Sequence, residues 1–496
     1  MVTSDPLTPA SIRTRGHLIR LGPAKGDAME SLVEREAASG DHHGIKPIPQ
    51  ASRVLSARDV AVLWGDLGIG LLVLVTGALL VPALGFVQAF VAVVIGSIVG
   101  VGLLAFAASI GARYGVPSMV LFRPVLGIRG SWLPSALNVM QLVGWTAVEF
   151  WAMSYVADLV AEEVFGFSAR GLWLAAAAVV CTGLALWGPV GVTRIWLERF
   201  GVWVIAGISI VITFLVLTSD GIGDVLTQAG AGGFPTFGPA LDLVIAMPIS
   251  WLPLVADYTR FAARPGAAFR GTFWGYLVAN IWLYALGALL VLTADATPDP
   301  EGVAVGILAI AGGSVAGILF LVGLLVGETD EAFADIYSGA VSLQNIFPKL
   351  SVRASTIGIA GLATVLAAWL TMVRYEQFLF LIGSVFVPLF GILMAVYLSA
   401  RRDLDTRDLY RGSTGPFWYT SGVRWGAVWP WAAGFVAYHW VTPLGPSWWT
   451  DGFADFFGTP LSVRFPWLSA SLVSFVVAFA LMWLTTRRAG TQRLSS

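Results

Sequence analysis

The residues of this sequence best suited to chemistry are acids that stand inside long apolar runs. The run 314–344 carries the densest group, which consists of Glu328, Thr329, Asp330, Glu331 and Asp335. An ionisable side chain in hydrocarbon costs roughly 2.5 to 3.5 kcal/mol on insertion scales, so each acid needs a specific reason to be there. Carboxyl groups so close together cannot all stay ionised without a cation, and hard cations take oxygen ligands. This cluster of acids predicts a Na⁺ site, a proton relay or both. The alternative is that this end of the helix reaches water, which would leave some of the acids solvated.

Another acid, Glu149, shares one face of a predicted helix with Asn138, Gln141 and Trp145, because these residues follow one another at intervals of three, four and four. An indole one helical turn from a carboxylate suits a flat heterocycle, whose ring can stack while its N–H groups donate to the acid. The alternative is a core tryptophan beside an acid that pairs with another helix. We interpret Gln141, Trp145 and Glu149 as candidates for binding a substrate.

Two of the apolar runs are interrupted. The first contains Gly65-Asp66-Leu67-Gly68-Ile69-Gly70, and the sixth contains Met247-Pro248-Ile249-Ser250-Trp251-Leu252-Pro253. A broken helix frees backbone groups that must find a partner, and a substrate or an ion can be that partner. Broken helices at matching positions of two inverted halves indicate a transport site near the bilayer midplane. The alternatives are an interfacial acid for Asp66 and an ordinary proline kink in the sixth run.

The composition predicts the fold class. Of the 496 residues 57% are hydrophobic and 12% are charged, which is about half the charged share of a soluble domain. Too few polar side chains remain to cover a water-facing surface, so the apolar surface must face lipid. The apolar runs are continuous and about 20 residues long, as in membrane helices rather than barrel strands. We therefore expect an all-α polytopic membrane protein.

Several functional classes are disfavoured. The net charge of −1 argues against a nucleic-acid partner, and without a Walker loop ATP-driven transport within this chain is not expected. Three of the four histidines precede residue 44, and His439 stands alone in an apolar run, so we expect no transition metal. No nucleophile–base pair accompanies the buried acids. We therefore assign no catalytic residue, no enzyme activity and no cofactor other than a coupling cation.

We expect about twelve transmembrane helices, near 59–81, 86–112, 132–160, 171–190, 195–218, 239–260, 272–294, 314–344, 355–373, 377–400, 426–445 and 466–486. The apolar stretch 303–313 is too short to span and predicts a re-entrant or loop helix. The two broken helices begin consecutive five-helix blocks, and because five is odd the second block is inverted. The predicted organisation is a flexible cytoplasmic tail 1–57, a first inverted repeat 58–220, a second inverted repeat 221–402, two C-terminal helices within 403–486, and a cytoplasmic tail 487–496.

The charges of the connections predict the orientation. The connections after the even-numbered helices up to the tenth hold Arg113, Arg123, Arg129, Arg194, Arg260, Arg264, Arg270, Lys349, Arg353, Arg401, Arg402, Arg407 and Arg411. Those after the odd-numbered helices up to the ninth hold only Arg170 and Arg374. Because basic connections stay on the cytoplasmic side, both termini are expected in the cytoplasm of a multi-pass inner (cell) membrane protein.

Four phrases make the sequence similar to a known family. They are Gly44-Ile45-Lys46-Pro47-Ile48-Pro49, then Gly115-Val116-Pro117 with Arg123 and Gly127-Ile128-Arg129-Gly130, then Trp145 with Glu149, and finally Ala256-Asp257-Tyr258-Thr259-Arg260-Phe261. Over about residues 44–400 the chain resembles the nucleobase–cation symporter-1 family, which includes cytosine, hydantoin, allantoin, uracil and hydroxymethylpyrimidine transporters. The resemblance implies a five-plus-five inverted-repeat fold of the leucine-transporter type with two extra helices. In appearance the chain is most similar to the hydroxymethylpyrimidine/cytosine-type branch.

The resemblance also implies roles for single residues. In the family the third helix supplies a stacking tryptophan followed four residues later by an amide; Trp145 matches, and Glu149 replaces the amide. The sixth helix supplies residues that face the substrate, for which the matching positions are Met247, Pro248, Ser250 and Trp251. The eighth helix supplies hydroxyl ligands of Na⁺ and then a polar substrate ligand, for which the placements are Thr329, Asp330 and Asp335. Acids in place of amides favour a ligand rich in N–H donors or carrying positive charge.

We therefore predict a secondary active transporter that imports a nucleobase-like heterocycle, such as a pyrimidine or purine, by alternating access and symport of Na⁺ or H⁺. The predicted substrate residues are Trp145, Glu149, Gln141, Met247, Pro248, Ser250, Trp251, Asp335 and Asp66, and the predicted coupling-ion residues are Gly65, Gly68, Thr329, Asp330 and Glu331. The alternative on the same scaffold is an amino-acid or amine symporter. An ion channel would need a repeated filter sequence, and an enzyme would need a nucleophile. The expected partners are the heterocycle and the lipid bilayer, and a monomer is the working assumption.

Overall fold

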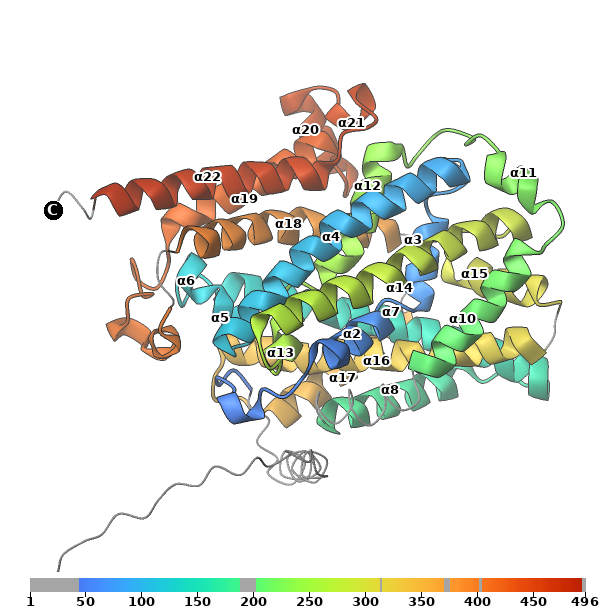
Figure 1. Ribbon diagram of the computed structural model, residues 1–496, viewed down its shortest axis with the longest axis horizontal. Coiled ribbons are helices and arrows are strands. Elements are labelled where there is room, and N and C mark those ends of the chain that lie inside the picture. The colour runs from blue at the N-terminus through green and yellow to red at the C-terminus, as the bar shows by residue number, and fades with distance from the viewer. Residues whose placement is uncertain (1–43, 188–201, 313–314, 370–374, 401–403, 493–496) are drawn as a thin grey trace, which may run out of the picture. The chain divides into compact units, whose positions relative to one another are not determined.

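The computed structural model describes residues 44–187, 202–312, 315–369, 375–400 and 404–492 (Figure 1). Its longer helices are α2 (Ala57–Asp66), α3 (Leu71–Ala78), α4 (Phe86–Tyr114), α7 (Trp132–Phe165), α8 (Arg170–Trp187), α10 (Val202–Leu217), α12 (Phe237–Ser250), α14 (Pro265–Ala294), α16 (Val315–Ile346), α17 (Val352–Trp369), α18 (Tyr375–Ser399), α19 (Trp425–Val441) and α22 (Ala470–Gln492). Shorter helices in the connections are α5 (Ser118–Leu121), α6 (Arg123–Leu126), α11 (Ile222–Thr227), α13 (Val255–Thr259), α15 (Pro300–Ile310), α20 (Ser447–Phe457) and α21 (Leu461–Arg464).

Each predicted span corresponds to one of these helices or to a broken pair. Within the described ranges, seven stretches are long and apolar enough to cross a membrane, and the bent pair α2–α3 would make an eighth. Of the remaining four, α7 and α16 carry polar side chains within the span, while α10 and α19 have 16 and 17 residues. The apolar stretch near 303–313 forms α15, whose 11 residues are too few to span.

Parts of the prediction fall on residues that the structure does not describe. They are positions 1–43 of the expected N-terminal tail, the end of the fourth predicted helix at 188–190, the start of the fifth at 195–201, positions 313 and 314 before and at the start of the eighth, the end of the ninth at 370–373, the end of the chain at 493–496, and the loop charges Arg194, Arg374, Arg401 and Arg402.

The helices pack closely through small residues. Helix α14 lies against α2, α3 and α4, α7 lies along α16, and α22 packs against α18 and α19. A Cβ on Gly275 would lie 2.3 Å from the carbonyl oxygen of Ala61, and one on Gly287 would lie 1.9 Å from that of Leu74. Lipid tails are as apolar as leucine, so membrane helices associate through such close backbone contact rather than through hydrophobic burial.

Residues 44–55, which we expected to belong to a flexible tail, pack against the helices. The Arg260 guanidinium donates to the Gly44 carbonyl at 2.6 Å, and the Tyr410 hydroxyl donates to the Ile45 carbonyl at 2.5 Å. The segment therefore joins the end of α13 to the connection between α18 and α19.

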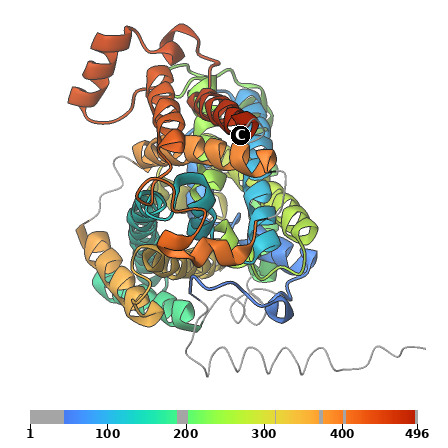
Figure 2. The ribbon, with the colours of Figure 1, turned by 90° about the vertical axis from the view of Figure 1, so that its left-hand side faces the viewer.

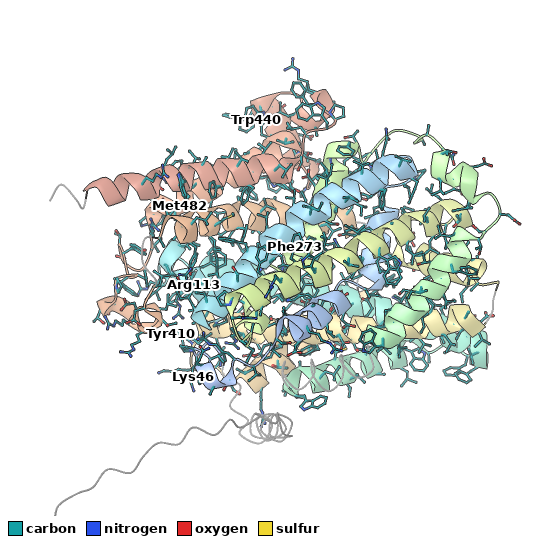
Figure 3. The ribbon with its side chains drawn as sticks, viewed as in Figure 1. Lys46, Arg113, Phe273, Tyr410, Trp440 and Met482 are labelled. Atoms are coloured by element: carbon teal, nitrogen blue, oxygen red, sulfur yellow. The ribbon has the colours of Figure 1, made fainter. Side chains whose placement is uncertain are left out.

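The arginine-rich connections meet at the same end of the helices. Arg123, in the connection after α4, donates to the Leu409 carbonyl in the connection after α18, at 2.8 Å. Figure 2 looks onto this end and shows the α18–α19 connection facing the viewer. The side chains labelled toward the left of Figure 3 at this end are Lys46, Arg113 and Tyr410. Connections that share the predicted cytoplasmic side thus lie together in space.

Candidate functional site

The predicted break in the first span is present. Helix α2 ends at Asp66, α3 begins at Leu71, and the two axes differ by 62°. The N–H groups at the start of a helix lack intrahelical partners and favour negative charge. Here the Leu71 N–H donates to Oε1 of Glu328 at 2.6 Å. An acid of α16 therefore holds the first turn of α3.

The predicted break in the sixth span is also present. Helix α12 ends at Ser250 and α13 begins at Val255. The Ser250 carbonyl accepts a hydrogen bond of 2.8 Å from Nε2 of Gln141 on α7, and the Ser250 hydroxyl donates to the Met247 carbonyl at 2.6 Å. The side chain of Gln141 thus supports the broken backbone, and α7 is positioned by this contact against the second break.

A small enclosed space lies between the second break, α7 and α16. It is lined by Trp145, Glu149, Met247, Ser250, Trp251, Glu331 and Asp335. Every one of these residues was named from the sequence, although Glu331 was assigned to the ion rather than to the substrate. The free volume of about 10 Å³ is close to that of a single water molecule. A heterocycle can therefore enter only when the surrounding helices or side chains move apart.

Several polar atoms around this cavity are buried and have no hydrogen-bond partner among the described residues. They are Oε2 of Glu149, Oε1 of Glu331, Oε1 of Gln141 and Nε1 of Trp145. Buried polar groups in native proteins nearly always have partners, and an isolated interior charge is very costly. Unpartnered acceptors and an indole donor around one space are the groups that a polar ligand would satisfy.

A second acidic spot lies beside the cavity at the first break. The carboxyl groups of Asp66 and Asp330 are buried and lie next to one another. Ionised carboxylates are acceptors only, so this contact needs a shared proton or a cation. Gly70, at the start of α3, faces the neighbouring acids: a Cβ there would lie 2.5 Å from Oε1 of Glu331 and 2.9 Å from Oε1 of Glu328.

Seven predicted residues do not line the cavity. Gln141 and Asp330 are described above, and the other five have the following contacts. The Thr329 hydroxyl donates to the Val326 carbonyl of its own helix at 2.6 Å and is only half-buried. The Pro248 ring packs on α4, where a Cβ on Gly100 would lie 2.5 Å from it. Gly65 and Gly68 face α14. Asp66 faces Asp330 rather than the cavity, which fits an ion better than a substrate.

Tyr375, at the start of α18, is the neighbour of the cavity that the sequence analysis missed. Its ring meets that of Trp145 edge-on at 6.0 Å, and its hydroxyl lies 3.3 Å from Oγ1 of Thr76 and 3.7 Å from the sulfur of Met247. Tyr375 also lines a second cavity of about 220 Å³, together with Val75, Leu79, Pro298, Asp299, Pro300 and Glu376. It therefore belongs to the wall of the second cavity and contacts two residues that line the first.

Asp242 is a buried acid that differs from those at the cavity because its carboxylate oxygens have hydrogen-bond donors. Its carboxylate accepts the Ser469 hydroxyl at 2.5 Å, the Ala470 N–H at 2.8 Å and the Ser471 N–H at 2.9 Å. These donors form the start of α22, so Asp242 joins α12 to the last helix as a cap. The residue is fully satisfied and lies outside the candidate site.

Comparisons with known proteins agree with this geometry. A family described as "Permease for cytosine/purines, uracil, thiamine, allantoin" matches residues 47–459. The chain is 25% identical to a hydantoin permease of Microbacterium maritypicum over 421 residues, which cover 81% of this chain and 84% of the relative. It is 25% identical to an allantoin permease of Bacillus subtilis (77% and 83% covered) and 27% identical to a cytosine permease of Escherichia coli K12 (75% and 83% covered).

Solved structures show the same fold. A nucleobase-cation-symport-1 family transporter in a closed conformation with bromovinylhydantoin bound superimposes with a TM-score of 0.76 at 21% identity, covering 90% of this chain and 96% of that one. A Na⁺-coupled sialic acid symporter in an outward-open state gives a TM-score of 0.60 at 11% identity, covering 94% and 96%. The predicted fold class, an all-helical membrane protein of the leucine-transporter type with two additional helices, is confirmed.

Proposed function

Because the chain belongs to the family of permeases for cytosine/purines, uracil, thiamine and allantoin, we propose that it imports a nucleobase-like heterocycle by secondary active transport. The observation that carries the proposal is the cavity beside the second break, which combines two indoles, Trp145 and Trp251, with three buried carboxyl groups. A flat ring stacks on Trp145, and its N–H groups donate to Glu149. Relatives named as hydantoin, allantoin and cytosine permeases support a ring of this kind.

The coupling cation, Na⁺ or H⁺, binds at the first break. Asp66 and Asp330 lie together there, and Glu331 lies beside Gly70. Backbone carbonyls of the break, those of Gly65 and Gly68 among them, are further oxygen ligands of the type that hard cations prefer, although the Gly65 carbonyl also accepts the Gly68 N–H at 3.3 Å. The Na⁺-coupled sialic acid symporter of similar fold supports a coupled cation. Glu331 lines the cavity as well, so ion and substrate share one acid.

Transport proceeds by alternating access between two inverted repeats, 58–220 and 221–402. The two breaks begin the two repeats; the first contacts α16 through Leu71 and Glu328, and the second contacts α7 through Ser250 and Gln141. Tyr375 must move for a substrate to pass from the second cavity into the first. The protein works as a monomer in the inner membrane with both termini in the cytoplasm, in keeping with the arginine-rich connections at one end.

An aliphatic amine symporter is the competing proposal, since the same carboxyl groups would bind an ammonium group. The two indoles in the lining favour an aromatic ring over an aliphatic chain. The family's members are permeases, so no enzyme activity is proposed.

A thermal-shift screen tests the function. Purified protein is heated with pyrimidines, purines, hydantoins and thiamine precursors, with and without Na⁺ and at two pH values. A ligand at 100 times its Kd adds about 2.7 kcal/mol of stability, so a true substrate raises the melting temperature. Trp145→Ala should abolish that rise, while Trp369→Ala, which removes an exposed indole of α17, should keep it. No shift with any heterocycle, or a shift that Trp145→Ala preserves, would contradict the proposal.

A further inference from the structure

We propose that the substrate binds as a cation: an aromatic heterocycle that carries positive charge on its ring or on an attached amidine-type nitrogen. The inference rests on the proposed function, since it concerns the charge of the ring that occupies the same cavity.

The first argument is the balance of charge. The cavity is lined by Glu149, Glu331 and Asp335, which are at most 3% exposed, and by no Lys, Arg or His among the described residues. Asp66 and Glu328 lie directly behind them, at the first break. Acids this close together and this buried need protons or cations as partners, and a positively charged ligand can take the place of such a proton or cation.

The basic residues of the described interior are committed elsewhere. The two buried arginines are Arg123 and Arg260. Arg123 donates to Oδ1 of Asn345 at 3.0 Å, and Arg260 donates to the Tyr337 hydroxyl at 3.0 Å. Both also donate to backbone carbonyls of the connections, at the end of the helices described above. Neither guanidinium forms an ion pair with an acid of the cavity, so a positive ligand is the partner that the cavity lacks.

The second argument is the inventory of donors and acceptors. The unpartnered atoms of the cavity lining include two acceptors, on Glu149 and Glu331, and one donor, Nε1 of Trp145. A third unpartnered acceptor belongs to Gln141, which contacts the lining residue Ser250. The Ser250 hydroxyl already donates to a backbone carbonyl. A neutral ring with several carbonyl groups would place its acceptors against carboxylates. An amidinium-type ring presents only N–H groups, two of which can bind one carboxylate side by side.

The third argument is the aromatic lining. Trp145 and Trp251 both border the cavity, and Trp is the side chain whose face attracts a cation most strongly. Stacking alone would hold a neutral and a charged ring about equally. The indoles together with the carboxyl groups select the charged one.

The test uses two rings of the same shape that differ in charge: 4-amino-1-methylpyridinium, a permanent cation, and 4-methylaniline, its neutral counterpart. Isothermal titration of the full chain in lipid nanodiscs measures both, with cytosine and uracil as neutral nucleobases. The cation should bind about tenfold more tightly than its isostere, the ratio by which a charge-assisted hydrogen bond exceeds a neutral one. Glu149→Gln should remove most of this preference. Asp335→Asn provides the same test if the first variant fails to fold, and Asp451→Asn, an exposed acid of α20, should leave the preference unchanged.

The outcomes separate this inference from the proposed function. Equal or tighter binding of 4-methylaniline would overturn the cationic substrate. A cation preference that survives in both cavity variants would overturn the assignment to these acids. If only neutral nucleobases bind, and Trp145→Ala abolishes that binding, the transport of heterocycles stands and the inference falls. If no ring of either charge binds, both are wrong.

Discussion

Replacing Gly70 by alanine should damage the site while leaving the fold intact. The added methyl group would lie 2.5 Å from Oε1 of Glu331 and 2.9 Å from Oε1 of Glu328. The backbone itself tolerates alanine, because its φ of −149° and ψ of 166° are ordinary extended values. Both crowded atoms are the ends of flexible side chains, so the two acids will move rather than the helices.

The size of the effect follows from these distances. To reach an ordinary contact of 3.4 Å, the Glu331 oxygen must retreat by about 1 Å, and misplacing a functional group by that much can cost about 100-fold. Forced overpacking costs about 1 to 3 kcal/mol. We therefore expect about 5- to 100-fold weaker binding of substrate and coupling cation. The free energy of unfolding should fall by about 1 kcal/mol, at the low end of the overpacking range, because the crowded atoms belong to flexible side chains.

Binding is measured by isothermal titration of the strongest ligand from the thermal-shift screen, with and without Na⁺. The matched control is Gly102→Ala on α4, where a new Cβ meets nothing within 4 Å and alanine should stabilise the helix slightly. If Gly70→Ala binds ligand and cation as the wild type does, the two glutamates do not need their observed positions. If Gly70→Ala unfolds, the crowding strains the backbone, and the reasoning about flexible side chains is wrong.

Three further predictions concern other parts of the molecule. Trp145→Ala should fold and insert but bind substrate about 5- to 150-fold more weakly, because stacking is worth roughly 1 to 3 kcal/mol per base; unchanged affinity in titration would remove Trp145 from the site. If Na⁺ is the coupling ion, Asp330→Asn should reduce Na⁺-dependent uptake and the Na⁺-induced thermal shift together, since coupling is reciprocal. If H⁺ is the ion, the same change should flatten the pH profile of uptake. Wild-type behaviour of both Asp330→Asn and Glu331→Gln would make these acids structural. Asp242→Ala should lower stability in a melting experiment by about 2 kcal/mol through loss of the α22 cap while substrate affinity stays unchanged, and a wild-type melting temperature would contradict the cap.

The sequence predicts the parts of this site that depend on local patterns. The breaks of the first and sixth spans arise from glycine and proline phrases a few residues long, and both appear where expected. The interval between Trp145 and Glu149 places both on one face of α7, and both line the cavity. Helical periodicity also explains why Thr329 lies apart: one residue from Glu328 and two from Glu331, it is rotated away from the face that those acids share.

Contacts between distant segments could not be predicted in this way. Tyr375 meets Trp145 because the first residue of α18 comes close to α7 in space, and no pattern near Tyr375 indicates that contact. Gly70 belonged to the first broken phrase, but its role depends on two acids of α16 that lie more than 250 positions away. Asp242 is likewise explained only by its donors in α22.

The partners of the buried acids distinguish structural acids from functional ones. Asp242 accepts three hydrogen bonds from the start of α22, so both of its carboxylate oxygens have donors. Oε2 of Glu149 and Oε1 of Glu331 have no such donor among the described residues, although both acids are equally buried. Burying an acid that has no hydrogen-bond donor is costly. If such an acid only stabilised the fold, an apolar residue of similar size could replace it without loss of stability. The presence of two unpartnered glutamates, Glu149 and Glu331, beside an indole is therefore explained by a ligand that comes from outside the chain. A transporter is the kind of membrane protein whose cycle requires such a ligand to bind and to leave.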